Sequence, residues 1–365
     1  MISTKNMLKK SVMGIKEYVP GKSIEEIVAS YGIKPENIIK LGSNENPLGP
    51  SQKSVEAVRA IADGINIYPS VDAAELRTAL SQYLGYPADQ VVMGAGMDGI
   101  VDTMMRLFIQ PGTSAIITTP TFSYYEIAVR SAGGNPVFVK RQSDFSIDTK
   151  AVLSSIDENT RIIFLCSPNN PTGNTISEAD VRTIVESTNA IVFLDEAYVE
   201  FAQKSLTGLV AEYENLVSGR TMSKVMGLAG LRIGYGIVPN WIYKEYMKVT
   251  TPFSISRIAV AAGLAALEDP EYTKNTIQNV FIGREFLTEG LSNYCKVYPS
   301  EGNFIMIDVK PKKSSDVTEA LLTRGIIVRD CASFKDAGEN LIRITVGTPS
   351  QNQQVISALA EILQS

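Results

Sequence analysis

Between residues 90 and 237, short apolar runs alternate with longer stretches in which apolar side chains recur at helical spacing. The short runs are rich in β-branched residues and carry almost no polar position, which is typical of strands buried on both faces. Such strands, separated by helices, predict an α/β fold with a mostly parallel sheet covered by helices. The predicted strands cover residues 91–93, 115–118, 137–139, 162–166, 191–194, 216–220 and 232–237.

Two of the intervening helices leave clear signals. In residues 98–109, four apolar side chains share one helical face: Val101, Met104, Met105 and Phe108. A later helix is predicted to begin after Ser177, because Asp180 follows at the spacing of a capping box.

The pattern changes after Phe253. A long helical stretch over residues 258–293, interrupted at Asp269-Pro270, leads to short strands at 304–309, 326–329 and 342–346 and to a last helix from about residue 350. This order predicts a smaller α+β domain. A chain of 365 residues is long enough for two domains. We predict a large domain at 47–257 and a small domain made of 1–46 and 258–365.

Composition narrows the classes of partner. The net charge is −5 and there is no basic block, so we expect no nucleic-acid partner. The basic N-terminus has no apolar stretch after it, and no uncharged apolar segment reaches 18 residues. Three separated cysteines are too few for a disulfide framework or a cysteine-based metal site. We therefore expect a cytoplasmic protein without a membrane span or a metal.

The chain contains no histidine. This excludes Ser-His-Asp and Cys-His triads, histidine-ligated zinc and histidine acid–base pairs. An enzyme with this sequence must move protons with Lys, Tyr, Cys, Asp or Glu.

Polar and glycine-rich motifs follow several predicted strands. The segment from Gly94 to Gly99 matches G-x-G-x-x-G between a strand and a helix. The acidic residue that a dinucleotide site needs about 20 positions later is absent, so nicotinamide binding is disfavoured. A phosphate at the helix N-terminus and a purely structural turn both remain open.

Three further motifs end strands: Asn170 in SPNNPTG, Asp195 in DEAY, and Ser223-Lys224 ahead of Arg232. Taken singly, each has a structural explanation: a fixed turn, a buried salt bridge or a solvated lysine. Because carboxyl ends of parallel strands meet at one edge of a sheet, we expect the motifs to surround one crevice. A lysine amine, a carboxylate, hydroxyl and amide donors and a phosphate cradle together are typical of a pyridoxal-phosphate site.

With these motifs the sequence resembles the fold-type I aminotransferases. The motifs are SPNNPTG, DEAY, and SK followed eight residues later by the Arg of LRIGYG. Further segments resemble the histidinol-phosphate aminotransferase family, and the resemblance runs from about Tyr18 to Gly347. These segments are YVPGK, LGSNENPLGP, Tyr68-Pro69, EGNFIMID, IIVRD and IRITVGT.

The resemblance implies a role for each matching residue. Lys224 is the Schiff-base lysine, Asp195 pairs with the pyridine nitrogen, and Asn170 and Tyr198 hold the ring hydroxyl oxygen. Phe122 stacks on the ring. The implied phosphate ligands are Ala95, Gly96, Met97, Ser223 and Arg232, joined by Tyr68 from a second subunit. A homodimer is therefore implied.

The resemblance also implies the substrates, histidinol phosphate with 2-oxoglutarate or glutamate. The implied substrate-binding residues are Tyr18, Asn44, Arg329 and Arg343. An arginine fork suits carboxylate and phosphate alike. For Arg329 an ion pair with Asp330 or another acidic residue is the structural alternative. An aromatic amino-acid aminotransferase is the main rival activity, followed by a threonine-phosphate decarboxylase. A ligand-sensing regulator is disfavoured, because neither terminus has room for a DNA-binding module.

Overall fold

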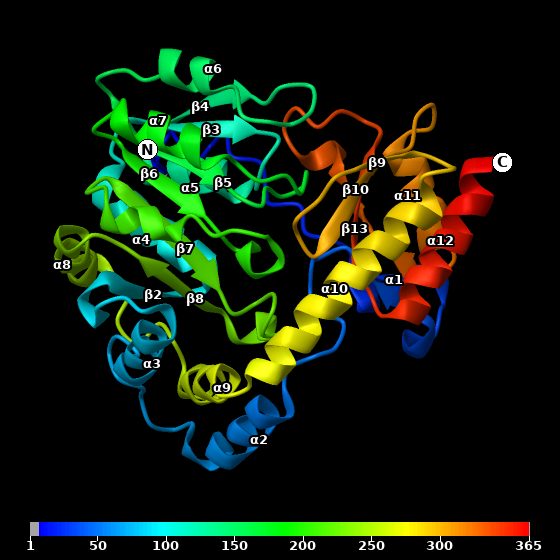
Figure 1. Cartoon of the computed structure of the whole chain (residues 1–365), viewed down its shortest axis with the longest axis horizontal. Coiled ribbons are helices and arrows are strands. Elements are labelled where there is room, and N and C mark those ends of the chain that lie inside the picture. The colour runs from blue at the N-terminus through cyan, green and yellow to red at the C-terminus, as the bar shows by residue number, and fades with distance from the viewer. Residues whose placement is uncertain (1–6, 365) are drawn as a thin grey trace, which may run out of the picture.

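The computed structural model describes residues 7–364 and has two lobes (Figure 1). The larger lobe contains a seven-stranded sheet, and the smaller one is built around a four-stranded sheet. Helix α10 (Pro270–Leu291) runs from the larger lobe to the smaller one. The α/β fold predicted from the alternating pattern is confirmed, whereas the domain boundaries at residues 47 and 257 stay a prediction.

The large sheet has the order β2-β8-β7-β6-β5-β3-β4, and all seven predicted strands are present. Only β8 runs against its neighbours, because it pairs antiparallel with β2 and β7 while the other pairs are parallel. The strands are β2 (Val91–Ala95), β3 (Ser114–Thr119), β4 (Asn135–Lys140), β5 (Thr160–Cys166), β6 (Ile191–Asp195), β7 (Leu216–Thr221) and β8 (Ile233–Ile237).

Helices pack around this sheet and bury their apolar faces. In α4, the buried residues include Val101, Met104 and Met105, as predicted, whereas Phe108 is only partly buried. The Ser177 side chain accepts a hydrogen bond from the Asp180 amide at 3.1 Å and caps α7. The helices of this lobe are α2 (Gln52–Ile61), α3 (Ala74–Leu84), α4 (Gly96–Phe108), α5 (Tyr124–Ala132), α6 (Thr149–Ser154), α7 (Glu178–Glu186), α8 (Asn240–Val249) and α9 (Arg257–Leu267).

The smaller lobe combines an antiparallel sheet, β12-β13-β10-β9, with a parallel pair, β1-β11. One predicted strand, 326–329, is split between the two sheets, because β11 ends at Ile327 and β12 begins at Arg329. Two short strands, β1 and β9, carry too little apolar pattern to be predicted. The strands are β1 (Ile39–Lys40), β9 (Lys296–Tyr298), β10 (Phe304–Asp308), β11 (Ile326–Ile327), β12 (Arg329–Asp330) and β13 (Leu341–Thr345).

The predicted helix break at Asp269-Pro270 is confirmed. Helix α9 ends at Leu267, and Asp269 then caps α10 by accepting a hydrogen bond from the Tyr272 amide at 3.3 Å. The remaining helices are α1 (Ile24–Tyr31), α11 (Ser314–Leu322) and α12 (Pro349–Gln364). Among residues 7–364, none of the helices has the length and apolarity that crossing a bilayer requires.

Gly234 lets β8 approach the first turn of α4. A Cβ at this position would overlap the Gly96 carbonyl oxygen and lie 2.6 Å from the Met97 nitrogen. We expect Gly234→Ala to lower the free energy of unfolding by about 1–3 kcal/mol, because backbone must move to accept the methyl group. Thermal unfolding measures the change. Gly208→Ala is the control, since its Cβ would meet nothing within 4 Å. If Gly234→Ala melted at the same temperature as the wild type, this packing argument would be contradicted.

Candidate active site

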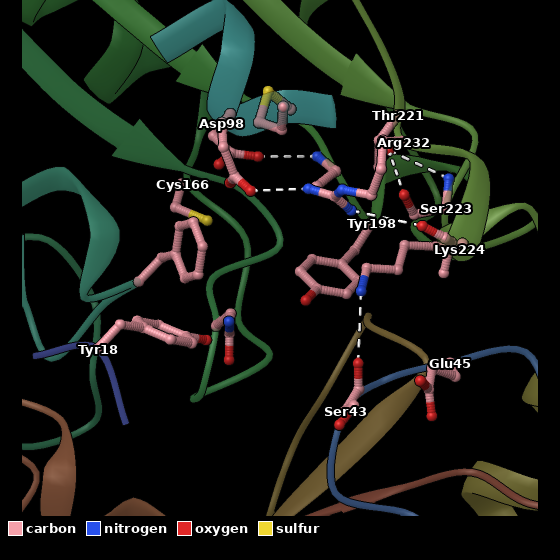
Figure 2. Close-up of a pocket in the computed structure, with 17 residues that line it drawn as sticks. Tyr18, Ser43, Glu45, Asp98, Cys166, Tyr198, Thr221, Ser223, Lys224 and Arg232 are labelled. Atoms are coloured by element: carbon pink, nitrogen blue, oxygen red, sulfur yellow. Dashed lines mark hydrogen bonds and ion pairs between the residues drawn. The ribbon is translucent and has the colours of Figure 1, made fainter. Parts of the chain in front are cut away.

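A cavity of about 370 Å³ lies at the carboxyl ends of β5, β6 and β7 (Figure 2). In parallel sheets the ligand crevice lies at the carboxyl ends of the strands, so the cavity has the position expected for a ligand site. Most of the predicted site residues line it: Tyr18, Met97, Phe122, Asn170, Asp195, Tyr198, Ser223, Lys224 and Arg232.

Asp195, the last residue of β6, is a buried carboxylate with neutral partners. Its Oδ1 accepts the Ala197 amide at 2.9 Å, and its Oδ2 accepts the Tyr125 hydroxyl. No cation among the described residues forms an ion pair with it, which removes the structural salt bridge considered from the sequence. Burial raises the pKa of Asp195 to about 6, against the lowering effect of the two hydrogen bonds.

Lys224 lies in the loop after β7 and points into the cavity (Figure 2). Its Nζ is 3.5 Å from the Ser43 carbonyl oxygen and 5.5 Å from the centre of the Tyr198 ring. Burial is the largest cause that lowers the pKa of Lys224, to about 8, and the Arg343 guanidinium adds to it. The lysine is therefore no solvated surface charge.

The first turn of α4 and the segment before β8 form the glycine-rich end of the cavity. The Gly96 amide donates to the Arg232 carbonyl at 2.8 Å, so this N–H is already used within the fold. What glycine supplies here is space, because a Cβ on it would lie 2.5 Å from Arg232 Nη2. Arg232 also pairs with Asp98 at 2.8 Å. Burial raises the pKa of Asp98 despite this pairing.

A hydrogen-bonded network joins the two lobes beside the cavity. The Asn44 amide group donates to the Tyr198 hydroxyl at 3.0 Å, and Thr345 from β13 donates to the Asn44 side chain at 3.0 Å. Arg343 donates to the side-chain oxygen of Asn170 and, at 2.6 Å, to the Gly42 carbonyl. Asn44 and Arg343 thus lie directly behind the residues that line the cavity.

Arg329 and Arg343 are register partners on adjacent antiparallel strands, and both are buried. Neither forms an ion pair with a carboxylate among the described residues. Arg329 donates to the Val19 carbonyl at 2.8 Å and to Ser333 at 3.0 Å. The alternative ion pair with Asp330 is absent. Arg343 keeps a buried Nε without a partner, and burial lowers its pKa. Two buried cations without an anion form a site suited to an anionic ligand.

A second cavity, of about 640 Å³, adjoins the first and shares Tyr18 and Phe122 with it. Tyr18 comes from the N-terminal arm and packs edge-on against Phe122, with ring centres 6.4 Å apart. Arg329 lines this second cavity. The substrate-binding residues predicted from the sequence are therefore distributed between the two cavities and the network beside them.

Three predicted residues lie elsewhere. Ala95 and Gly96 are next to the cavity without lining it. Tyr68 lies outside both cavities, is 79% exposed and packs against Phe253, with ring centres 4.9 Å apart.

Sequence reasoning missed Tyr125, Asp98 and Ser43. Tyr125 belongs to the apolar face of α5, where an aromatic side chain is indistinguishable from core. Asp98 stood inside the G-x-G-x-x-G match, and its acidic side chain next to a predicted phosphate site was the available signal. Ser43 contributes a backbone carbonyl, for which a sequence gives no signal.

The chain belongs to the aminotransferases of class I and II, whose family model matches residues 36–359. The closer resemblance, to histidinol-phosphate aminotransferases, is also confirmed. The enzyme of that name from Methanosarcina mazei is 55% identical over 98% of this chain and 97% of its own length. The one from Methanococcoides burtonii is 53% identical over 98% and 99%.

A solved structure extends the likeness to three dimensions. Histidinol-phosphate aminotransferase from Sinorhizobium meliloti, crystallised with pyridoxal-5'-phosphate, is 26% identical. It superimposes with a TM-score of 0.87 and covers 100% of this chain and 99% of its own. The fold-type I architecture predicted from the motifs is confirmed.

Proposed function

We propose that this chain catalyses pyridoxal-phosphate-dependent transamination of L-histidinol phosphate with 2-oxoglutarate, giving imidazole acetol phosphate and glutamate, in histidine biosynthesis. The observation that carries the substrate assignment is the pair of buried arginines, Arg329 and Arg343, which have no carboxylate partner within residues 7–364. The relatives from Methanosarcina mazei and Methanococcoides burtonii bear the name of this activity.

The residues around the first cavity fit pyridoxal phosphate. In the part of the chain that the structure describes, the Asp195 carboxylate pairs with no cation, and each oxygen keeps acceptor capacity beyond its one protein donor, as pairing with a pyridinium requires. The amine of Lys224 points into the cavity, and Gly96 leaves room for the guanidinium of Arg232, a cavity residue that suits a phosphate. When bound, the cofactor would withdraw electrons from the substrate Cα–H bond.

The roles of the chain's own residues follow from their surroundings. Lys224 anchors the cofactor, and its free Nζ accepts the proton from the substrate Cα. Its lowered pKa increases the share of neutral amine near neutral pH. Tyr198 and the Asn170 amide group orient the ring hydroxyl. The phosphate is assigned to the Ala95–Met97 turn, Ser223 and Arg232, and Phe122 covers the ring.

Substrate recognition is assigned to the lobe interface. Arg343 binds the carboxylate of 2-oxoglutarate, and its unpartnered Nε supports a direct contact with an anion. Arg329 and Tyr18 bind the phosphate of histidinol phosphate in the second cavity. Asn44 orients Tyr198 beside them. One arginine pair thereby serves two different anions in turn.

The active form is proposed to be a homodimer. Tyr68 lies outside the cavities of its own chain, so a contact with a cofactor phosphate requires a second copy. The residues around Tyr68 support a surface that a second subunit covers. Further exposed apolar side chains lie there: Ile65, Ile67, Val71 and Phe253. We further propose a cytoplasmic location, supported by three cysteines that are all free.

The absorbance spectrum tests the function directly. Protein saturated with pyridoxal phosphate should show the visible band of the lysine-bound cofactor, and L-histidinol phosphate added without an acceptor should remove it. Tyrosine and phenylalanine should remove the band far more slowly. Absence of the band, with Lys224→Ala as the reference, would refute the cofactor assignment. A faster response to the aromatic amino acids would instead identify an aromatic aminotransferase.

Arg329→Ala should lower kcat/KM for histidinol phosphate by about one to two orders of magnitude, as expected for lost hydrogen bonds to a charged group. Turnover of tyrosine, which has no phosphate, should change little. Steady-state kinetics with both donors measures the difference. Arg324→Ala is the control, because Arg324 pairs with Glu361 on the surface. Equal losses for the two donors would rule out the phosphate contact.

Mixing two inactive variants tests the contribution of Tyr68. Tyr68→Ala and Lys224→Ala should each lose activity as homodimers. After denaturation and joint refolding, about a quarter of wild-type activity should return, since half of the dimers are mixed and each has one intact site. If the mixture stays inactive although mixed dimers are isolated, Tyr68 does not act across subunits.

A further inference from the structure

Tyr125 lies behind the proposed cofactor site and contacts two of its residues. It belongs to the first turn of α5, its side chain is fully buried, and its hydroxyl donates to Asp195 Oδ2. Its ring stacks on Phe164, with centres 4.3 Å apart and planes 8° apart. The ring also meets Phe122 edge-on at 5.6 Å and 90°. A single side chain therefore contacts both the carboxylate and the aromatic ring that face the cavity.

The Asp195 carboxylate depends on this contact. Only two protein donors reach it among the described residues, the Tyr125 hydroxyl on one oxygen and the Ala197 amide on the other. A buried charged group that loses one of its donors is left with part of its desolvation uncompensated. The amide is fixed by the backbone, so the Tyr125 hydroxyl is the one side-chain contact that sets the rotation of the carboxylate.

We propose that Tyr125 is a positioning residue, whose hydroxyl holds the Asp195 carboxylate and whose ring holds Phe122 in the orientations that a pyridinium ring bound between them requires. The identity of that ring rests on the proposed function. The contacts to Asp195 and Phe122 do not.

A phenol suits this position because its hydroxyl donates a hydrogen bond to Asp195 without neutralising the charge of the carboxylate. A lysine or arginine at the same place would form an ion pair with Asp195 and compete with the bound pyridinium for its charge. Burial and the neighbouring carboxylate raise the pKa of Tyr125 well above its ordinary value, so the hydroxyl keeps its proton. The carboxylate thus remains available to a cationic ligand.

Other charged and titratable groups surround Asp195 and bear on any pH dependence. Asp98 and Glu196 both raise its pKa. Burial raises the pKa of Cys166, its partner on β5, to about 12, so this thiol stays neutral near neutral pH. Arg141 stands behind Cys166 and Tyr125 and donates to the Phe145 carbonyl at 3.1 Å. Tyr198 is a further titratable neighbour, and Lys224 and Arg232 line the same cavity.

The test compares Tyr125→Phe with wild type in the cofactor-free state by thermal unfolding across pH. The folded-state pKa of Asp195 is raised to about 6 from 3.8, so ionisation of Asp195 lowers the stability of both proteins as pH rises from about 4 to 6. In the wild type this contribution of Asp195 is complete above about 6, and other buried groups, such as Glu200 with a pKa raised to about 7, affect both proteins alike. The variant, whose Asp195 pKa is raised further, should continue to lose stability relative to the wild type, by up to about tenfold in the unfolding constant per pH unit.

Two controls separate this effect from the loss of a buried hydroxyl. Tyr246→Phe removes a hydroxyl that is equally buried but donates to the Met93 backbone carbonyl at 3.0 Å, so its effect should be the same at every pH. In an Asp195→Asn background, Tyr125→Phe should also become independent of pH. If Tyr125→Phe does not fold, Phe164→Leu, which loosens the stacked ring, should show the same pH dependence with a smaller amplitude.

Cofactor affinity gives the second readout. We expect Tyr125→Phe to bind pyridoxal phosphate about tenfold more weakly at pH 8, measured by titration of the apoprotein. Equal affinities, or a stability difference that does not vary with pH, would overturn the inference. If wild type binds no pyridoxal phosphate at all, the proposed function fails and the positioning role toward its ring fails with it. The unfolding series alone still decides whether Tyr125 and Asp195 are coupled.

Discussion

The parallel alignment of β5, β6 and β7 determines where the groups of the cavity lie. Cys166 is the register partner of Asp195, and Asp195 is the partner of Gly219, so the three strands end at nearly the same level. The loops that follow them carry Asn170, Tyr198 and Lys224 into one space. The reversed strand β8 completes the arrangement, because it begins beside the end of β2 and brings Arg232 to the first turn of α4.

Two neighbouring carboxylates show how the fold distributes charge. Glu196 is buried and fully paired: Arg220 contacts it at 2.8 Å, and the Leu206 amide donates to it at 2.6 Å. Asp195, one residue earlier, receives only neutral donors from the described residues, which leave its charge uncompensated. Alternation along the chain sends the first side chain to the cavity and the second to the protein interior. The unpaired charges of Asp195, Lys224 and Arg343 are therefore concentrated where a ligand binds, at a cost to the stability of the folded protein.

The sequence was sufficient for the strands of the large sheet, because wholly apolar β-branched runs have few other interpretations. It was also sufficient for most cavity residues, since the ends of parallel strands are fixed by the topology. The sequence was insufficient where tertiary packing determines the structure. The break at Val328 that separates β11 from β12 has no local signal, and the three-residue strand β9 is defined by its pairing with β10. Tyr125 was hidden among core aromatics, because its function depends on a hydrogen bond across 70 residues.

The parallel pair β1-β11 ties the beginning of the chain to the smaller lobe. Leu41 continues this attachment, since its amide donates to the Ile327 carbonyl at 2.7 Å and its carbonyl accepts the Thr345 amide at 2.9 Å. Only three residues later, Asn44 contacts Tyr198 in the larger lobe. So short a tether leaves almost no slack. A rotation of the smaller lobe would therefore move Ser43, which lines the cavity, so that ligand entry and the angle between the lobes are coupled.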